Sequence, residues 1–365
     1  MSFLILDRLS KSFGAVKVFD GLSLAVAKGE TVAICSPSGS GKTLLLRLIA
    51  GIYEPDAGEI LIDGKAVTGL APDARGIGMA FQNFALYPHL TAFENIASPL
   101  RARGVAEAEL TRRVGRVAEI LKIGHVLRHL PRELSNGQKQ RTALARAIVA
   151  DARLLLLDDP LRNVDAKLRY EMRHELPRVL REFEATVLYV TQDFREAMAL
   201  GRRIGVLHGG GFVQVDRPQR IYADPETVEV ARLFGDPTIN LYDSELAGGA
   251  VSLLGLTLGL PGAADGGRRP CRVGVRPEHV ELDAGGEAAP DGGAGGLPVT
   301  IEAVTPLNQN AVLLLQAAGG GEILASTTLQ RAEALARGPR RAIARVRPEH
   351  LLLFDRDSGA RIRTG

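Results

Sequence analysis

The stretch SPSGSGKT at residues 36–43 has the composition of a loop that binds phosphate groups. Lys42 can reach the β- and γ-phosphates of a nucleotide, and the hydroxyl of Thr43 can hold Mg²⁺. The stretch follows the apolar run TVAICS (31–36) and precedes a leucine-rich segment, so we predict a strand, a P-loop and a helix rather than a linker. The full pattern begins with glycine, whereas Ser36 occupies that place here. The residues expected to contact the polyphosphate are Ser36, Ser38, Gly39, Ser40, Gly41, Lys42 and Thr43.

Two adjacent carboxylates, Asp158 and Asp159, end the apolar run LLLLDD. A carboxylate at a strand tip beside a P-loop can hold Mg²⁺ directly or through water. The acidic residue that follows it can orient or deprotonate an attacking water molecule. We therefore predict that Asp158 binds the metal together with Thr43, and that Asp159 is the catalytic base.

Apolar runs indicate the elements that must position these residues. Short apolar runs followed by turn or helix signals are typical of buried parallel strands in an α/β sheet. Helical spacing of apolar residues predicts one helix around 110–121 and another over 168–179, which Pro177 is expected to kink or interrupt. Antiparallel strands are expected near the start, with Asp63-Gly64 as a hairpin turn. The parallel strands are predicted at 31–36, 76–82, 154–159 and 186–193.

The composition of the chain changes after Gly235. Glycine becomes frequent, and short runs of alternating apolar and polar residues replace helical patterns. We predict a nucleotide-binding domain over 1–235, with a helical subdomain at about 83–150, and a second domain over 236–365. The second domain is expected to be a small β-barrel or sandwich, with DGGAGG (291–296) as a mobile loop. The segments 273–282 and 345–354 both contain Arg-Pro-Glu-His, which indicates a duplicated β-unit.

Composition excludes several classes of protein. The 365 residues are 45% hydrophobic and 24% charged, which is typical of folded domains rather than disordered chains. A net charge of +3 gives no electrostatic basis for a nucleic-acid partner. No apolar run approaches the roughly 20 residues needed to span a bilayer. The two cysteines are far apart in sequence, which favours a reducing compartment over a disulfide framework.

The segment LSNGQKQRTALARAI (134–148) resembles the signature of the ATP-binding-cassette (ABC) family, LSGGQ followed by a helix rich in arginine and alanine. Other stretches extend the resemblance over the whole chain. FQNFALYPHLTAFENIASPL (81–100) resembles the glutamine loop of the family, and PLRNVDAKLR (160–169) resembles its D-loop. The part containing the Arg-Pro-Glu-His motifs looks like the OB-like (TOBE) accessory domain of sugar importers of the maltose type.

The resemblance implies a fold, a cofactor and roles for further residues. The fold is an α/β P-loop NTPase core with an antiparallel β subdomain and a helical subdomain, followed by the all-β accessory domain. ATP and Mg²⁺ are the implied cofactors. Gln82 is implied as a switch residue that also contacts the metal, Phe13 as the aromatic that stacks on adenine, and Gln192 as the residue at the position of the switch histidine. The signature residues implied to bind nucleotide across a dimer are Ser135, Asn136, Gly137 and Gln138, with Asp165 in the D-loop.

The resemblance also implies partners and a location. Two ATPase subunits, of the same or different chains, close head to tail around two ATP molecules. Each ATP then lies between the P-loop of one subunit and the signature of the other. Separate permease subunits in the membrane would be moved through the surface around residues 82–130, with a periplasmic or extracellular solute-binding protein delivering the solute. The chain would lie peripherally on the cytoplasmic face of the cell membrane.

Several catalytic positions depart from the family pattern. Asp159 stands where glutamate is usual, which shortens the reach of the carboxylate by about 1.5 Å. Misplacement on that scale can slow a reaction by about 100-fold. Gln192 replaces the switch histidine and cannot carry a positive charge. Asn136 replaces the first glycine of the signature, where it is the most tolerable substitute if the backbone has a positive φ. Arg162 stands where a small hydroxyl residue is common.

These departures leave three interpretations open. The chain is an active ATPase for which Asp159 suffices, the weaker half of an asymmetric pair whose partner supplies glutamate and histidine, or a regulatory subunit that does not hydrolyse ATP. For the function as a whole, the resemblance indicates an importer ATPase for a sugar or a polyol such as glycerol. The alternatives are an importer ATPase for an anion, a metal or a polyamine, and a cassette ATPase that takes no part in transport.

Overall fold

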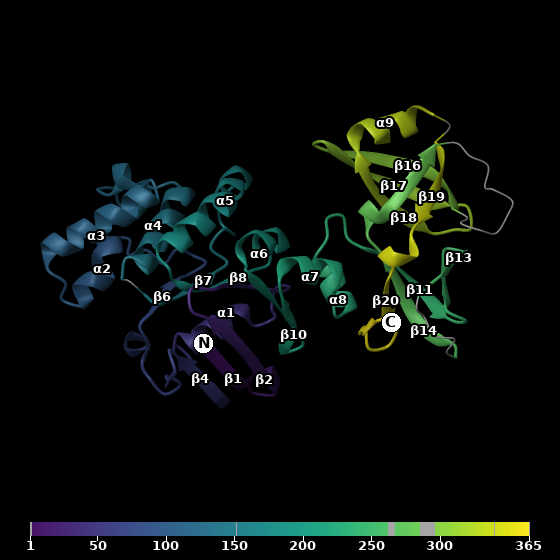
Figure 1. The fold of residues 1–365 in the computed structure, drawn as a ribbon. Coiled ribbons are helices and arrows are strands. Elements are labelled where there is room, and N and C mark those ends of the chain that lie inside the picture. Colours follow the sequence, from purple (N-terminus) through teal and green to yellow (C-terminus); the bar gives the residue numbers. More distant parts are fainter. Residues whose placement is uncertain (1, 151, 262–266, 285–295, 339, 365) are drawn as a thin grey trace. The chain divides into compact units, whose positions relative to one another are not determined.

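The computed structural model describes residues 2–150, 152–261, 267–284, 296–338 and 340–364 (Figure 1). The chain divides into two compact units, Met1–Gln219 and Arg220–Gly365. Most of the stretch 291–296, expected as a mobile loop, lies outside the described residues.

A largely parallel sheet forms the centre of the first unit, in the order β10-β9-β3-β8-β7-β6. Neighbouring strands from β9 to β6 run parallel, and only β10 joins the sheet antiparallel to β9. Every residue of β7 and β8 is buried, because helices and the second sheet cover both faces. This explains why the sequences of these strands are mostly apolar. The strands are β3 (Thr31–Cys35), β6 (Ile77–Ala80), β7 (Leu154–Asp158), β8 (Thr186–Thr191), β9 (Arg203–His208) and β10 (Gly211–Asp216).

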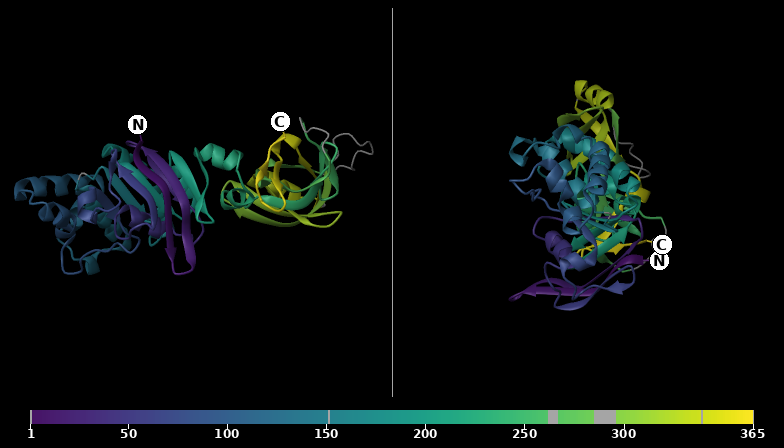
Figure 2. Two further views of the ribbon diagram at one scale, coloured as in Figure 1. Left: turned by 90° about the horizontal axis from the view of Figure 1, so that it is seen from below. Right: turned by 90° about the vertical axis from the view of Figure 1, so that its left-hand side faces the viewer.

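A second sheet, in the order β2-β1-β4-β5, is antiparallel. Asp63 and Gly64 connect β4 to β5 with φ angles of 51° and 74°, as the predicted two-residue hairpin turn requires. The apolar side chains of β1 and β2 share a buried cluster with Leu154 and Val190 of the central sheet. Figure 2 shows the long hairpin β1–β2 running beside the central strands. The strands are β1 (Ser2–Phe13), β2 (Val16–Ala27), β4 (Ala57–Ile62) and β5 (Lys65–Ala66).

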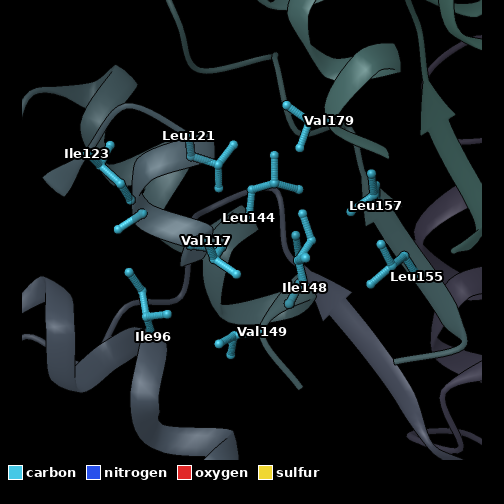
Figure 3. Close-up of a cluster of buried hydrophobic side chains, with 14 of the residues drawn as sticks. Ile96, Val117, Leu121, Ile123, Leu144, Ile148, Val149, Leu155, Leu157 and Val179 are labelled. Atoms are coloured by element: carbon cyan, nitrogen blue, oxygen red, sulfur yellow. The ribbon is translucent and has the colours of Figure 1, made fainter. Parts of the chain in front are cut away.

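Three longer helices lie between β6 and β7 in the sequence, and their apolar faces form one core with β7 and α5. Figure 3 shows this core, in which Val117 and Leu121 face Leu144 and Ile148. Helix α3 buries Leu110 as well, as the helical spacing predicts. The helices of this unit include α1 (Lys42–Ile49), α2 (Ala92–Ala102), α3 (Glu107–Ile120), α4 (Asn136–Ile148), α5 (Ala166–Glu182) and α6 (Phe194–Leu200).

Helix α5 continues through Pro177, so of the expected kink or interruption, the interruption is wrong. Proline removes one backbone hydrogen bond and crowds the preceding turn. Leu176, Val179 and Leu180 are nevertheless buried on both sides of it. The burial of this apolar face offsets the local cost and keeps the helix in one piece.

The second unit consists mainly of antiparallel strands, in the sheet orders β11-β14-β20-β21, β12-β13 and β15-β19-β16-β17-β18. One amphipathic helix, α9 (Leu329–Arg337), was not expected from the sequence; it buries Ala332 and Leu335 against the β-core. The strands are β11 (Asn240–Leu246), β12 (Ala250–Leu253), β13 (Leu256–Gly259), β14 (Arg269–Val275), β15 (Val280–Ala284), β16 (Leu297–Leu307), β17 (Asn310–Ala317), β18 (Glu322–Thr328), β19 (Arg341–Val346), β20 (Leu352–Asp355) and β21 (Arg361–Ile362).

The two Arg-Pro-Glu-His motifs adopt the same 3₁₀ turn, at Pro277–His279 and Pro348–His350. The rings of His279 and His350 stack with centroids 4.0 Å apart. Each motif leads from one strand into the next, β14 to β15 and β19 to β20. The structure thus gives both copies of the repeated sequence the same local role.

The units divide at Gln219, whereas the sequence predicts a boundary after residue 235. The segment between these positions contains α8 (Val228–Leu233) and most of α7 (Pro218–Ala223). Val228 is buried in a cluster with Phe354. The guanidinium of Arg276 donates hydrogen bonds to the carbonyls of Phe234 and Tyr222. Packing and hydrogen bonding therefore join this segment to the β-rich unit, although its helical pattern resembles the first unit.

Among the described residues, no helix is both long enough and apolar enough to cross a membrane.

Candidate nucleotide-binding site

The predicted catalytic residues follow neighbouring parallel strands at the same edge of the central sheet. The order β3-β8-β7-β6 places the P-loop after β3, Gln192 after β8, Asp158 at the end of β7 and Gln82 after β6. Carboxyl ends of parallel strands meet at one edge, where the loops form the usual ligand crevice of an open α/β sheet. The topology therefore brings together residues that are up to about 150 positions apart in sequence (Gln192 minus Lys42).

The P-loop residue Lys42 is buried, and its ammonium group lies inside the loop. Its Nζ donates hydrogen bonds to the carbonyls of Ser36 at 2.7 Å and Pro37 at 2.6 Å, and it lies 3.4 Å from the hydroxyl of Ser40. Burial lowers the pKa of Lys42, while the nearby carboxylates act in the opposite direction. A polyanion entering the loop would supply the negative charge that this buried cation lacks.

Two glycines allow the loop its shape. Gly39 and Gly41 have φ angles of 81° and 93°, in the region that favours glycine. A side chain at Gly41 would also meet the rings and methyls of Phe19 and Val18 at 2.9 Å. Ser36, in place of the first glycine of the pattern, does not need such a conformation; its buried hydroxyl pairs with that of Ser40. This pair and the bond from Ser40 to the carbonyl of Pro37 (2.9 Å) brace the base of the loop.

Thr43 and Asp158 form an oxygen-only set of potential metal ligands. The Thr43 hydroxyl donates to Oδ1 of Asp158 at 3.0 Å. Burial raises the pKa of Asp158, whereas the bond from Thr43 and the charges of Arg47 and Lys42 lower it. Hydroxyl and carboxylate oxygens are the ligands that Mg²⁺ prefers, and a buried carboxylate gains from a nearby cation. These residues therefore fit Mg²⁺.

Asp159 is buried at the same edge and has a left-handed backbone, with φ of 44°. Its amide donates to the carbonyl of Val190 at 2.8 Å, which fixes it against β8. Burial raises the pKa of the Asp159 carboxyl, and the positive charge of Arg162 lowers it. The Thr191 hydroxyl lies 3.4 Å from its Oδ1. A buried carboxylate with few hydrogen bonds and a raised pKa has the properties of a general base.

Gln192 follows β8 and is partly buried, next to the network that surrounds Asp159. Within the described part of the chain its amide makes no hydrogen bond. Its neighbour Thr191 donates to Glu196 at 2.9 Å, and Tyr189 donates to the same carboxylate at 2.7 Å. Burial raises the pKa of Glu196. Gln192 thus has an unengaged amide at the tip of a strand that buried hydrogen bonds hold in place.

The loop after β6 carries Gln82 and is held by two other segments. The side chain of Asn163, in the segment that resembles the D-loop, donates to the carbonyl of Gln82 at 2.9 Å. Arg146, near the end of α4, donates to the carbonyls of Phe84 at 3.1 Å and Ala85 at 2.7 Å. Both Phe84 and Ala85 have positive φ angles, which non-glycine residues adopt at a cost unless the surroundings compensate. Neither Arg146 nor Asn163 was expected at the site from the residue patterns.

The signature residues lie at the start of α4. Ser135 is the N-cap: its hydroxyl accepts from the amide of Gln138 at 3.3 Å, and the side chain of Gln138 accepts from the amide of Ser135 at 2.9 Å. Ser135 is exposed and Gln138 is partly buried. The Ser135 hydroxyl still has its proton to donate, and the helix start offers amides to an anion.

The fold explains why asparagine and glycine are acceptable at positions 136 and 137, which the sequence did not indicate. Asn136 is the first residue of α4 and has a helical backbone, so the positive φ considered for it does not occur. Asparagine is acceptable because this position never needed glycine. A side chain at Gly137, in contrast, would clash with Cδ2 of Leu168, so the Leu168 side chain would have to move. Glycine there leaves room for Leu168 of α5 in its present place.

Asp165 and Phe13 are exposed and lie apart from the P-loop contacts described above. Asp165 caps α5, accepting from the amide of Leu168 at 2.9 Å. Phe13 ends β1, and its ring meets that of Tyr53 edge-on at 5.9 Å, with Lys11 Nζ 5.6 Å from its centroid. Its hairpin is the one that packs on Gly41 through Val18.

The structure therefore joins some of the predicted residues and leaves others apart. Hydrogen bonds or electrostatic contacts link Lys42, Thr43, Asp158 and Asp159 within one chain. In the described ranges, no hydrogen bond or ion pair joins Ser135, Gln138, Asp165 or Phe13 to this group. Glu196 was missed because an acidic residue in an amphipathic helix resembles a solvent-facing one, whereas only the fold shows its burial.

Comparison with family models gives two matches. The model described as ABC transporter matches residues 19–162, and the model described as TOBE domain matches residues 273–354. The first range includes the P-loop, the signature and Asp159. The second includes both Arg-Pro-Glu-His motifs.

Curated relatives match over most of the chain. A protein of Cereibacter sphaeroides named sn-glycerol-3-phosphate import ATP-binding protein UgpC is 40% identical over 327 residues, covering 90% of this chain and 91% of the relative. A protein of the same name from Salmonella typhi is 41% identical, covering 83% of this chain and 84% of the relative. A solved structure of the ATP-binding cassette MJ0796, a dimer in a post-hydrolysis state with ADP and Pi, is 30% identical with a TM-score of 0.54. It aligns with 59% of this chain, and 98% of the cassette is covered.

Proposed function

The chain belongs to the ABC transporter family as an ATP-binding subunit of an importer, and on this premise we propose that it drives the uptake of a polyol phosphate of the sn-glycerol-3-phosphate type. The observation that carries the proposal is the 40% identity over nine-tenths of both chains with import subunits named for that solute. The TOBE match and the importer relatives argue against a cassette ATPase that takes no part in transport.

ATP would bind with its polyphosphate in the loop at 36–43. Ser38, Gly39, Ser40 and Gly41 supply backbone amides, and Lys42 exchanges the carbonyls of Ser36 and Pro37 for the β- and γ-phosphates. Phe13 would stack on the adenine, since its ring is exposed and aromatic faces bind bases. The buried charge of Lys42 makes this exchange favourable, because a phosphate replaces neutral carbonyl partners.

Thr43 and Asp158 would hold Mg²⁺, with Gln82 as a further oxygen ligand; when bound, the ion neutralises charge on the phosphates. Asp159 would accept a proton from the attacking water, for which burial has raised its pKa. Gln192 would donate a hydrogen bond from its amide to a phosphate oxygen.

A second ATPase subunit would complete each site. The exposed Ser135 hydroxyl and the start of α4 would approach the γ-phosphate bound to the other subunit, together with Asn136, Gly137 and Gln138. Asp165 would lie at the same interface. Permease subunits at the cytoplasmic face of the cell membrane would contact the surface around 82–130, and a solute-binding protein outside the membrane would supply the solute.

A transport assay tests the proposed solute. We expect vesicles that contain this chain with its neighbouring permeases and binding protein to accumulate radiolabelled sn-glycerol-3-phosphate when ATP is inside. Maltose, glycerol and inorganic phosphate are the comparison solutes. Uptake of another solute in preference to glycerol phosphate would contradict the proposed cargo but not the importer role. No ATP-dependent uptake of any solute, with nucleotide binding intact, would contradict the importer role.

A second test concerns the catalytic departures. We propose that the chain is competent on its own, as a homodimer, because Asp159 is placed against β8 and buried beside Lys42. We expect the purified chain to turn over ATP within tenfold of typical importer ATPases, and Asp159→Asn to reduce that rate by at least 100-fold. The measurement is steady-state phosphate release.

The competing interpretation, the weaker half of an asymmetric pair, predicts a different result. The wild-type chain would then be nearly inactive, and Asp159→Glu combined with Gln192→His would raise its rate by far more than tenfold. The third interpretation, a regulatory subunit, predicts that the same double substitution leaves the chain inactive. Unchanged ATP affinity in the double variant is the control that the site remains folded.

A further inference from the structure

Arg162 lies three residues after Asp159, the predicted catalytic base, in the turn that follows β7. Its amide donates to the carbonyl of Asp159 at 3.2 Å, which forms a tight turn. The turn directs the guanidinium back toward the base, with Nη1 of Arg162 at 3.9 Å from Oδ2 of Asp159. The Arg162 side chain is 48% exposed, whereas that of Asp159 is 9% exposed. The guanidinium therefore lies at the opening of the site and has donors left for another partner.

The ion pair with Asp159 does not by itself explain an arginine here. An ion pair contributes little to the stability of a fold when its arginine is half exposed and the nitrogen and oxygen are 3.9 Å apart. The guanidinium has five donors in a planar fork, and this contact uses at most part of it. The planar fork of arginine can bind two oxygens of a phosphate at once, as it can those of a carboxylate.

The electrostatic field of Arg162 reaches the residue that would bind the β- and γ-phosphates. The charge of Arg162 lowers the pKa of Lys42, in addition to the larger effect of burial. The positive charges of Arg162 and Lys42 both lower the pKa of Asp159. Arg162 therefore acts electrostatically on the same carboxylate as the phosphate-binding lysine, and its guanidinium lies 3.9 Å from that carboxylate.

Two departures from the family pattern compensate each other in charge. The family pattern has histidine, which can be cationic, after the last strand, whereas this chain has Gln192. Three residues after the catalytic base the pattern has a small hydroxyl residue, whereas this chain has the cation Arg162. Arg162 approaches Oδ2 of Asp159, and Thr191, the residue before Gln192, approaches its Oδ1.

We propose that Arg162 is a catalytic residue that binds the γ-phosphate of ATP from the same chain, in place of the cation missing at position 192. The proposal rests on the proposed function as an ATPase. With ATP bound, the fork of Arg162 would hold a γ-phosphate oxygen with one edge and Asp159 with the other. It would thereby offset the negative charge of the phosphate and keep the shorter carboxylate of Asp159 directed at the water.

Nucleotide binding by the full chain tests this without requiring hydrolysis. The variants are Arg162→Ser, which introduces a small hydroxyl residue, and Arg162→Lys, which keeps the charge but loses the fork. Arg153→Ser is the matched control, since Arg153 is an exposed partner of Asp63 at 2.9 Å on the same unit. The probes are ADP and the non-hydrolysable analogue AMP-PNP, both with Mg²⁺, measured by calorimetry.

We expect Arg162→Ser to weaken AMP-PNP binding by about tenfold, as for loss of one charged hydrogen-bonding contact, and to leave ADP binding unchanged. Arg162→Lys should lie between wild type and Arg162→Ser, and Arg153→Ser should match wild type. Equal affinities of Arg162→Ser and wild type for AMP-PNP would overturn the proposal. So would an equal weakening for both nucleotides, because Arg162 would then act on the fold and not on the γ-phosphate.

Turnover of the same variants provides a second readout. Arg162→Ser should slow hydrolysis by more than tenfold, and adding Gln192→His to it should restore much of the rate. No rescue by the histidine would contradict the exchange of roles between the two positions. If the wild-type chain binds neither nucleotide, the proposed function fails; if it binds both and Arg162→Ser changes nothing, only the role of Arg162 fails.

Discussion

Lys42→Ala is expected to abolish detectable ATP binding by the full chain. The substitution removes the ammonium that reaches the β- and γ-phosphates, a charge-assisted contact worth about 1.5–3 kcal/mol before any effect on dimer closure. It also leaves the carbonyls of Ser36 and Pro37 without their present donor, so that the loop loses its internal support. Calorimetric titration with ATP and Mg²⁺ measures the loss.

Lys17→Ala is the control for removing a lysine. Lys17 lies on the same unit, pairs with Asp20 at the surface and is 54% exposed. Its removal should leave ATP affinity within twofold of wild type. If Lys42→Ala kept wild-type affinity with a folded chain, the assignment of residues 36–43 as the phosphate loop would be wrong.

Ser135→Arg is expected to leave ATP binding by the single subunit intact and to eliminate dimer closure and hydrolysis. Ser135 is exposed, so an arginine fits on the subunit, but its bulk would obstruct the surface expected to meet the other subunit. Loss of the N-cap costs about 1 kcal/mol, which a domain of this size tolerates. Sedimentation with AMP-PNP measures closure, and phosphate release measures hydrolysis.

Thr91→Arg is a matched control for the lost cap. Thr91 caps α2 with the same reciprocal pattern, in which its hydroxyl accepts from Glu94 and Glu94 accepts from Thr91. This variant should still form the nucleotide-dependent dimer. Loss of ATP binding by the single Ser135→Arg subunit would mean that the signature acts within its own chain, and would refute the shared site.

The sequence predicted those parts of the site whose chemistry depends on residues that are neighbours along the chain. A lysine and a hydroxyl between a buried strand and a helix predict a P-loop, since local backbone geometry forms it. Apolar runs predicted β3, β6, β7 and β8, because the strands of a sheet that is covered on both faces are mostly apolar. The Asp63-Gly64 turn followed from the φ angles that those residues tolerate.

Other features depend on contacts between distant segments and could not be read from residue patterns. The reach of Arg146 to Phe84 and Ala85, and of Asn163 to Gln82, needs α4, the segment after β7 and the loop after β6 to be adjacent. The course of α5 through Pro177 depended on how much apolar surface surrounds it. The contact that a side chain at position 137 would make is with Leu168, which lies on another helix.

The amino-acid sequence by itself determined the types of the reactive groups and the strands, loops and helices that carry them, because those depend on short-range sterics and apolar periodicity. Only the tertiary structure decided which of those groups meet. Asp158 contacts Thr43 because β3, β8 and β7 lie side by side in the sheet. Burial in that arrangement also sets the pKa values of Lys42 and Asp159, since desolvation depends on everything that surrounds a charge.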